Sequence, residues 1–93
     1  MTFEVIIEPE AIEDLIAIRN YISKKDSKSK AVKFVLELKA SILSLSKMPM
    51  RCRRSFYSDN DTIRDLIFKR YTIVYKIEDN RVYVLTIFRQ REY

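Results

Sequence analysis

The sequence has 93 residues, 47% of them hydrophobic and 33% charged, which predicts one domain over residues 1–93 and no membrane-spanning segment. It contains no His, no Gly and one Cys, Cys52, which excludes a Ser-His-Asp triad, a Cys-His dyad, a transition-metal site, a glycine-rich phosphate loop and an internal disulfide. Residues 1–20 hold five acidic residues and one Arg, a net charge of −4 within a total of +5, so residues 21–93 carry +9 and favour an acidic partner such as nucleic acid or an acidic protein.

The first two predicted elements are a strand and a helix. Alternation over Phe3–Glu8 predicts a strand with one face in water. Proline suits the first turn of a helix, which we place from about Pro9 to Ser23. Residues spaced by three and four positions form its apolar stripe, with an Arg at the margin: Ile12, Leu15, Ile16, Arg19 and Ile22.

A polar connector and a second helix follow. The connector is KKDSKS, residues 24–29, in which Ser27 or Ser29 is a candidate N-cap. The second helix runs from Ala31 to near Lys47, where a proline two residues later should end it. Two helices joined by a short loop form an antiparallel hairpin, which is the expected cover for a sheet. Lysines in and around the connector are interpreted as a solvating coat: Lys24, Lys25, Lys28, Lys30 and Lys33.

Residues 50–61, MRCRRSFYSDND, are the least regular stretch of the sequence. Twelve residues is long for a connection in so small a domain, and such loops are often functional or else disordered. Arg53 and Arg54 beside Phe56 and Tyr57 combine cations with stacking surface, as in sites for unpaired nucleic acid. The alternative is that the aromatic side chains pack under the edge of the sheet.

The stretch Thr62–Arg91 holds three runs rich in Ile, Val, Tyr, Phe and Leu, separated only by Lys69-Arg70 and Asp79-Asn80. Breaks of two residues require antiparallel neighbours, and Asp-Asn tolerates the positive φ of a tight hairpin. Tyr71–Glu78 alternates between an apolar face and a mixed one, so the sheet needs a cover. We therefore predict an α/β (α+β) fold with element order β-α-α-β-β-β. Its mostly antiparallel four-stranded sheet has the first strand beside the last and the two-helix hairpin packed on one face.

Arginines supply the candidate target-binding residues: Arg53, Arg54, Arg64, Arg89 and Arg91. Arg89 and Arg91 project to the same side of a strand end and can grip a phosphate or an acidic side chain together, or else form a solubilising tail. Arg64 either has a functional or fold-defining role or pairs with a neighbouring carboxylate.

Other side chains are assigned to structural roles. Three acidic residues near the start of the first helix are assigned to a favourable interaction with the helix dipole and not to acid–base catalysis: Glu10, Glu13 and Asp14. Three tyrosines match the apolar parity of their strands and are expected in the core: Tyr71, Tyr75 and Tyr83.

Several short motifs occur in a defined order. The helical hairpin opens with Ala11-Ile12-Glu13-Asp14-Leu15, a strand reads Ile63-Arg64-Asp65-Leu66, the next contains YTIVY, and a basic RQRE segment ends the chain. In this order, and over nearly the whole chain, they resemble the RelE/ParE superfamily of bacterial toxins, the toxic halves of type II toxin–antitoxin pairs. The acidic start of the hairpin and the Ile-Arg-x-Leu strand resemble the ParE branch more closely.

The amino terminus, MTFEVIIEPE, lacks the basic residues and the long apolar run of a secretory signal, so we expect a cytoplasmic protein. The resemblance implies a toxin, without a cofactor or metal, that forms a hetero-oligomer with a cognate antitoxin. The antitoxin would lay a helix and an extended segment over the helical hairpin and the sheet edge. ParE-like members poison DNA gyrase, and this is the implied target. One alternative is a RelE-like member that cleaves messenger RNA on the ribosome, for which the implied catalytic residues are Arg64, Arg89, Arg91 and Tyr93. Another alternative is a member that has lost toxicity and only binds its antitoxin.

Departures from the RelE pattern concern its basic residues. The Arg of the Tyr-rich strand falls at Thr72, and the basic residues of the preceding strand fall near Ile63 and Asp65. The Arg-Glu pair after the last strand matches at Arg91-Glu92, whereas the His common in that region is absent. These departures argue against RNA cleavage more than against toxin identity.

Overall fold

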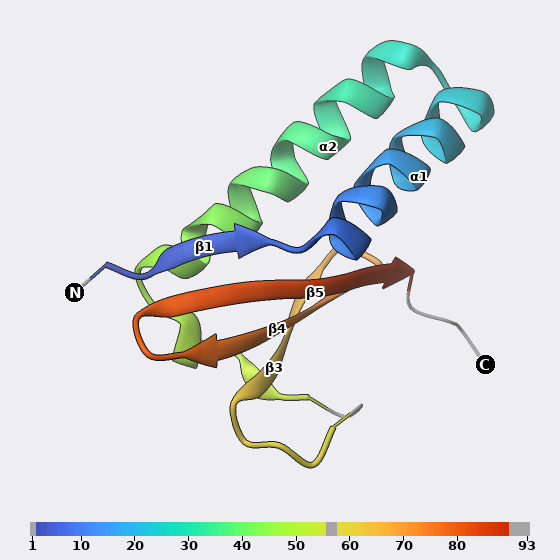
Figure 1. Ribbon diagram of the computed structural model, residues 1–93. Helices are drawn as coiled ribbons and strands as arrows, with labels where there is room; N and C mark the ends of the chain where they lie inside the picture. Colours follow the sequence, from blue (N-terminus) through green and yellow to red (C-terminus); the bar gives the residue numbers. More distant parts are fainter. Residues whose placement is uncertain (1, 56–57, 90–93) are drawn as a thin grey trace.

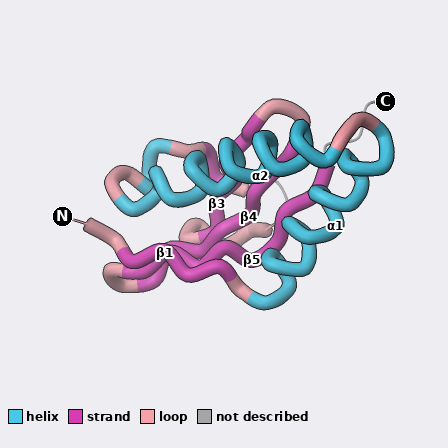
Figure 2. Tube along the Cα trace, turned by 90° about the horizontal axis from the view of Figure 1, so that it is seen from above, coloured by secondary structure: helices cyan, strands magenta, loops and turns pink. Residues whose placement is uncertain are grey.

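The computed structural model describes residues 2–55 and 58–89. The elements follow in this order: β1 (Glu4–Ile7), α1 (Pro9–Lys25), α2 (Lys28–Leu43), the 3-10 turns η1 (Ser44–Ser46) and η2 (Pro49–Arg51), β2 (Arg53–Arg54), β3 (Ile63–Phe68), β4 (Tyr71–Glu78) and β5 (Arg81–Arg89). Within these residues, five strands form one sheet in the order β1-β5-β4-β3-β2. The two helices lie side by side against one face of the sheet (Figure 1, Figure 2). Neither helix of this part of the chain has the length and apolar run needed to cross a membrane.

Strands β3, β4 and β5 form the antiparallel sheet that the sequence predicts. The two connecting turns are the predicted two-residue breaks. Their first residues, Lys69 and Asp79, adopt the left-handed region with φ values of 54° and 55°, as tight hairpins require. Strand β1 runs parallel to β5, with Val5 opposite Val82, so its predicted place beside the last strand is confirmed.

The predicted fold class is confirmed, but the sheet has a fifth strand. Arg53–Arg54, in the stretch expected to be irregular, pairs antiparallel with Arg64 and Asp65 of β3. Two residues are too few for alternation of apolar and polar side chains to reveal a strand. The expectation of four strands was therefore wrong at the β3 edge.

The helical hairpin is tighter than the sequence predicts. Only Asp26 and Ser27 separate α1 from α2, in place of the predicted connector 24–29. Lysines extend both helices, and those in the last turn of α1 interact favourably with the helix dipole. Ser27 is the N-cap, because its side chain accepts a hydrogen bond from the Lys30 amide at 3.2 Å. Helix α2 ends at Leu43, about one turn before its predicted end, and the chain continues as η1.

The core lies between the helical hairpin and the sheet. On β4 the predicted apolar face is buried: Tyr71, Ile73, Tyr75 and Ile77. Strand β5 has a bulge at Leu85, which has no partner on β4 and shifts the alternation by one residue. Core residues of β5 therefore lie on both sides of the bulge: Val82, Val84 and Ile87. Tyr83, the third tyrosine expected in the core, is half-buried.

Asp14 ties α1 to β5 at the end of the sheet. Strand β1 pairs with β5 only as far as Val84, so the following part of β5 needs other hydrogen-bond partners. The Oδ2 atom of Asp14 accepts hydrogen bonds from the Ile87 amide and the Thr86 hydroxyl, both at 2.9 Å. This carboxylate takes the place of a neighbouring strand and fixes the end of β5 against α1.

Candidate functional site

Arg64 binds backbone oxygens inside the protein. It lies on β3 opposite Tyr75 of β4. Its Nη1 atom donates to the carbonyl of Cys52 at 2.7 Å and to that of Met50 at 3.3 Å. Tyr75 is fully buried, and its hydroxyl donates a hydrogen bond to the carbonyl of Pro49, the first residue of η2. Burial raises the pKa of the Tyr75 phenol. Together the two side chains hold η2 and Cys52 against the sheet, which gives Arg64 a fold-defining position.

Arg53 and Arg54 of β2 each meet a carboxylate. The Nη2 atom of Arg53 lies 3.7 Å from Oδ2 of Asp65, whose side chain is fully buried. Arg54 forms an ion pair with Asp61, and both of these side chains are largely exposed, so water screens the pair. The aromatic residues at positions 56 and 57, predicted to act with these arginines, lie outside the described residues.

Arg89 lies apart from these three arginines. Arg89 pairs in register with Tyr71 at the start of β4, whereas Arg64 pairs with Tyr75. Tyr71 and Tyr75 are four residues apart on β4, a separation of roughly 13 Å at about 3.3 Å per residue. The Nη1 atom of Arg89 donates to the hydroxyl of Tyr21 at 3.2 Å. The structure therefore does not gather the four candidate arginines that it describes into one site. The other predicted carboxyl-terminal residues lie outside the described residues: Arg91 and Tyr93.

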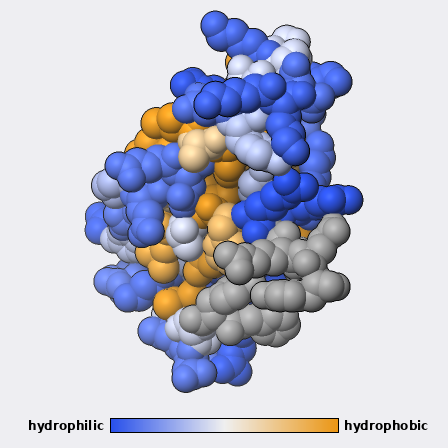
Figure 3. Space-filling view, turned by 90° about the vertical axis from the view of Figure 1, so that its right-hand side faces the viewer, coloured by the Kyte–Doolittle hydropathy of each residue, from blue (hydrophilic) through white to orange (hydrophobic). Residues whose placement is uncertain are grey.

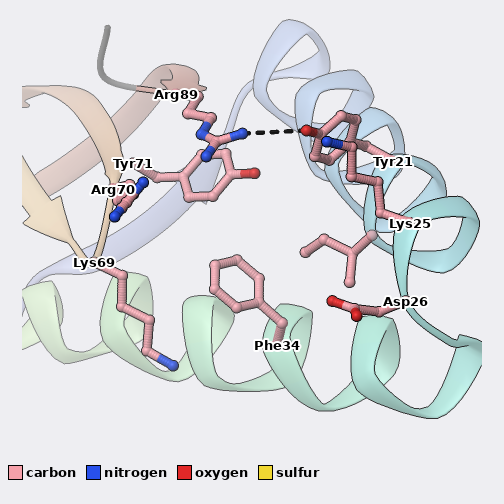
Figure 4. Close-up of a pocket in the computed structure, with 9 residues that line it drawn as sticks. Tyr21, Lys25, Asp26, Phe34, Lys69, Arg70, Tyr71 and Arg89 are labelled. Carbon is pink, nitrogen blue, oxygen red and sulfur yellow. Dashed lines mark hydrogen bonds between the residues drawn. The ribbon is translucent and has the colours of Figure 1, made fainter. Parts of the chain in front are cut away.

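A cleft of about 410 Å³ opens beside Arg89, between the α1–α2 connector and the β3–β4 turn (Figure 4). Four cations line it: Lys25, Lys69, Arg70 and Arg89. Among the described residues, Asp26 is the one carboxylate in the lining, which leaves a formal excess of three positive charges. The apolar part of the lining comes from Ile22, Phe34 and Tyr71. Figure 3 shows apolar surface between hydrophilic side chains on this side of the molecule. We term this surface the basic cleft.

Tyr21 lies between two of the cations of the basic cleft. The Lys25 Nζ atom lies 5.3 Å from the centre of its ring, and the guanidinium carbon of Arg89 lies 6.0 Å from it. The ammonium of Lys25, followed by the guanidinium of Arg89, lowers the pKa of the Tyr21 phenol. Within the described residues, neither cation forms an ion pair with a carboxylate. Lys69 differs, because its Nζ atom lies 3.1 Å from Oε2 of Glu37.

A second surface, which we term the apolar patch, lies on the outer side of the helical hairpin. Its side chains are about half exposed: Ile12 (46%), Ile16 (47%), Val32 (48%), Leu36 (62%) and Leu43 (55%). A hollow of about 280 Å³ beside it includes Arg19 and Lys39 in its lining. Tyr21 follows Ile12 by nine residues, about two and a half helical turns, so the basic cleft and the apolar patch lie on opposite sides of α1.

The sequence identifies Arg89 as a candidate but does not reveal the rest of the basic cleft. It assigns Lys25 to a solvating coat and Lys69-Arg70 to a turn, and it gives Tyr21 no role. The signal that unites these residues is topology, because the fold brings the last turn of α1, the connector between the helices, the β3–β4 turn and the end of β5 around one cleft. In the part of the chain that the structure describes, no three His, Cys, Asp or Glu side chains lie close enough to hold a metal ion.

Comparison with known proteins identifies the family. Residues 5–93 match the family described as the ParE toxin of the type II toxin-antitoxin system parDE. The chain belongs to this ParE toxin family. No curated protein matches the sequence.

Two solved structures share the fold of this ParE family member. One is from the chromosomal ParDE toxin–antitoxin system of P. aeruginosa, with a TM-score of 0.83 and 17% identity over 97% of this chain and 98% of that chain. The other is from the toxin-antitoxin complex RelBE2 of Mycobacterium tuberculosis, with a TM-score of 0.62 and 18% identity over 97% of this chain and 100% of that chain. At these identities the likeness concerns the fold alone.

The positions that carry basic residues in the RelE pattern hold buried or half-buried residues without positive charge in this ParE family member. Thr72 is fully buried, and Asp65 is 1% exposed and bound to Arg53. Ile63 is half-buried. These three positions therefore offer no cation to an RNA phosphate.

Proposed function

We propose that the protein is a growth-arresting toxin of the ParE type that binds DNA gyrase in the cytoplasm and is neutralised by a cognate antitoxin. The observation that carries the proposal is the match to the ParE toxin family over residues 5–93. The sequence has no His, and Thr72 and Asp65 are buried at RelE-type positions. Both facts favour a toxin that acts by binding a protein over one that needs acid–base groups to cleave RNA.

The apolar patch supports the antitoxin part of the proposal. Both structural neighbours come from toxin–antitoxin systems, and one is described as a complex. Large apolar side chains gathered on one side of a helical hairpin mark an interaction surface, since covering them removes apolar area from water. An amphipathic helix with apolar residues at spacings of three and four fits such a surface. Arg19 and Lys39 beside it complement acidic residues of the antitoxin.

The edge of the sheet supports an extended antitoxin segment. Strand β2 covers only Arg64 and Asp65 of β3, so among the described residues Leu66–Phe68 have no neighbouring strand on that side. An added strand would pair with these open backbone groups. Ile67, 40% exposed, would gain cover from it.

Induction of the chain alone in bacteria tests the proposal. Growth should stop while transcripts stay intact and plasmid supercoiling falls, and the purified protein should inhibit supercoiling by purified gyrase. Arrest with cut transcripts would instead favour a RelE-like endoribonuclease. Normal growth would favour a member that only binds its antitoxin.

The antitoxin surface is tested separately by co-expression with the antitoxin gene. Leu36→Asp places a charge in the centre of the apolar patch and should restore growth arrest in the presence of the antitoxin. The control is Lys33→Asp, at an exposed position of the same helix outside the patch; it changes the charge by two units instead of one and should nevertheless remain neutralised. Neutralisation of both variants alike would show that the antitoxin binds elsewhere.

A further inference from the structure

The basic cleft holds positive charge that the described residues leave without a counter-ion. Lys25 and Arg89 flank the ring of Tyr21, and neither forms an ion pair with a carboxylate of these residues. Arg53 and Arg54, on the edge strand β2, each meet a carboxylate. The basic cleft therefore brings together two cations that lack a carboxylate partner among the described residues, which favours an anion between them.

The aromatic side chains of the cleft favour a carboxylate over a nucleic-acid base. Phe34 packs against Tyr71 in a tilted arrangement with ring centres 5.5 Å apart, and edge-on against Phe68 with ring centres 5.7 Å apart. These rings contact one another and do not stand apart as platforms for stacking bases. The exposed ring of Tyr21 is already flanked by the Lys25 ammonium and the Arg89 guanidinium. A hollow with cations around an apolar floor suits an acidic side chain next to an apolar one.

The position of the cleft favours the target over the proposed antitoxin helix as its occupant. The apolar patch, which the proposed antitoxin helix covers, lies on the opposite side of α1. One helix laid along that patch does not reach the cleft. We propose that the basic cleft binds an acidic segment of the target protein, with Lys25 and Arg89 each binding a carboxylate and Tyr21 holding both cations in place. This inference rests on the proposed function, in which the target is DNA gyrase.

The experiment compares purified variants as inhibitors of supercoiling by purified gyrase. Lys25→Gln/Arg89→Gln removes two charges from the cleft, and Lys28→Gln/Lys33→Gln removes the same charge from exposed positions of α2 outside it. The half-inhibitory concentration should rise about tenfold or more for the cleft variant, because charge-assisted hydrogen bonds are lost. The control should stay within about twofold of the wild type. Circular dichroism confirms that both variants fold.

The outcomes separate this inference from the proposed function. A wild-type chain that does not inhibit gyrase would contradict the proposed function itself. A wild-type chain that inhibits gyrase, with a cleft variant that inhibits equally well, would overturn the cleft assignment and leave the proposed function standing.

Two other possible occupants of the cleft, the antitoxin and nucleic acid, would each give a distinct experimental result. A cleft variant that keeps gyrase inhibition but escapes the antitoxin would assign the cleft to the antitoxin. A single-stranded oligonucleotide that shifts the NMR signals of Tyr21, Lys25 and Arg89 at micromolar concentration would assign it to nucleic acid. Either result would overturn the proposal.

Discussion

Replacing Asp14 with Ala should destabilise the fold by about 2–4 kcal/mol. Its Oδ2 atom accepts two hydrogen bonds at 2.9 Å, from the Thr86 hydroxyl and the Ile87 amide. A hydrogen bond to a charged group contributes about 1.5–3 kcal/mol, and we take about 1–2 kcal/mol for each bond because the site is half-buried. Ile87 is 3% exposed, so little water replaces the lost acceptor. For a chain of 93 residues, this predicts a fall in Tm of at least about 8 °C.

The assay is thermal and urea unfolding followed by circular dichroism. Asp14→Asn keeps a carbonyl oxygen as acceptor and should lose only part of the stability. Glu13→Ala removes a neighbouring exposed carboxylate of α1 and serves as the matched control, with an expected change within about 0.5 kcal/mol. NMR hydrogen exchange adds a local measurement, because the Ile87 amide should exchange faster in Asp14→Ala.

Equal unfolding free energies for Asp14→Ala and Glu13→Ala would refute this reasoning. Asp14 would then only favour the dipole of α1, the role that the sequence alone assigns to it. Unchanged exchange of the Ile87 amide in Asp14→Ala would contradict the contact directly.

Three further predictions concern Arg64, Tyr75 and Tyr21. Arg64→Ala should lower the free energy of unfolding by about 1–3 kcal/mol in urea, because the Cys52 carbonyl loses its donor; no change would contradict the fold-defining position. Above pH 10 the free energy of unfolding of the wild type should fall relative to that of Tyr75→Phe, because burial keeps the Tyr75 phenol protonated in the folded state while it ionises in the unfolded state. Parallel pH profiles of the unfolding free energy for the two proteins would contradict this prediction. Lys25→Gln should raise the pKa of Tyr21 more than Arg89→Gln does, measured by NMR titration, because Lys25 lowers that pKa most; the reverse order would be inconsistent with the structure.

Local signals were enough to predict β3, β4 and β5. The alternation in Tyr71–Glu78 predicts its buried face, and the two-residue breaks force hairpins whatever the rest of the chain does. Burial on the second face of β4 was not predicted: the sequence marks that face as mixed, yet Thr72 and Val74 are buried. The bulge at Leu85 also escaped prediction, since it becomes visible only once β4 and β5 are paired.

The candidate site was only partly predictable because it depends on tertiary contacts. Arg89 can be singled out as a cation at a strand end, but its partner Tyr21 lies 68 residues earlier, on the flank of a helix whose spacing suggests solvent. Arg64 shows the opposite case. The sequence leaves its role open, and only the placement of Cys52 and Met50 reveals that its guanidinium binds backbone carbonyls.

On the proposed function, the arrangement of the two surfaces constrains how an antitoxin would neutralise the protein. Because the apolar patch and the basic cleft lie on opposite sides of α1, the proposed antitoxin helix would cover the patch and leave the cleft open to the proposed target. The open edge of β3 at Leu66–Phe68 leads directly into Lys69-Arg70, the turn that lines the cleft. An antitoxin strand paired with that edge would therefore end beside the cations that the proposed target needs. On this reasoning, an antitoxin truncated before its extended segment should still bind the apolar patch but no longer prevent inhibition of gyrase.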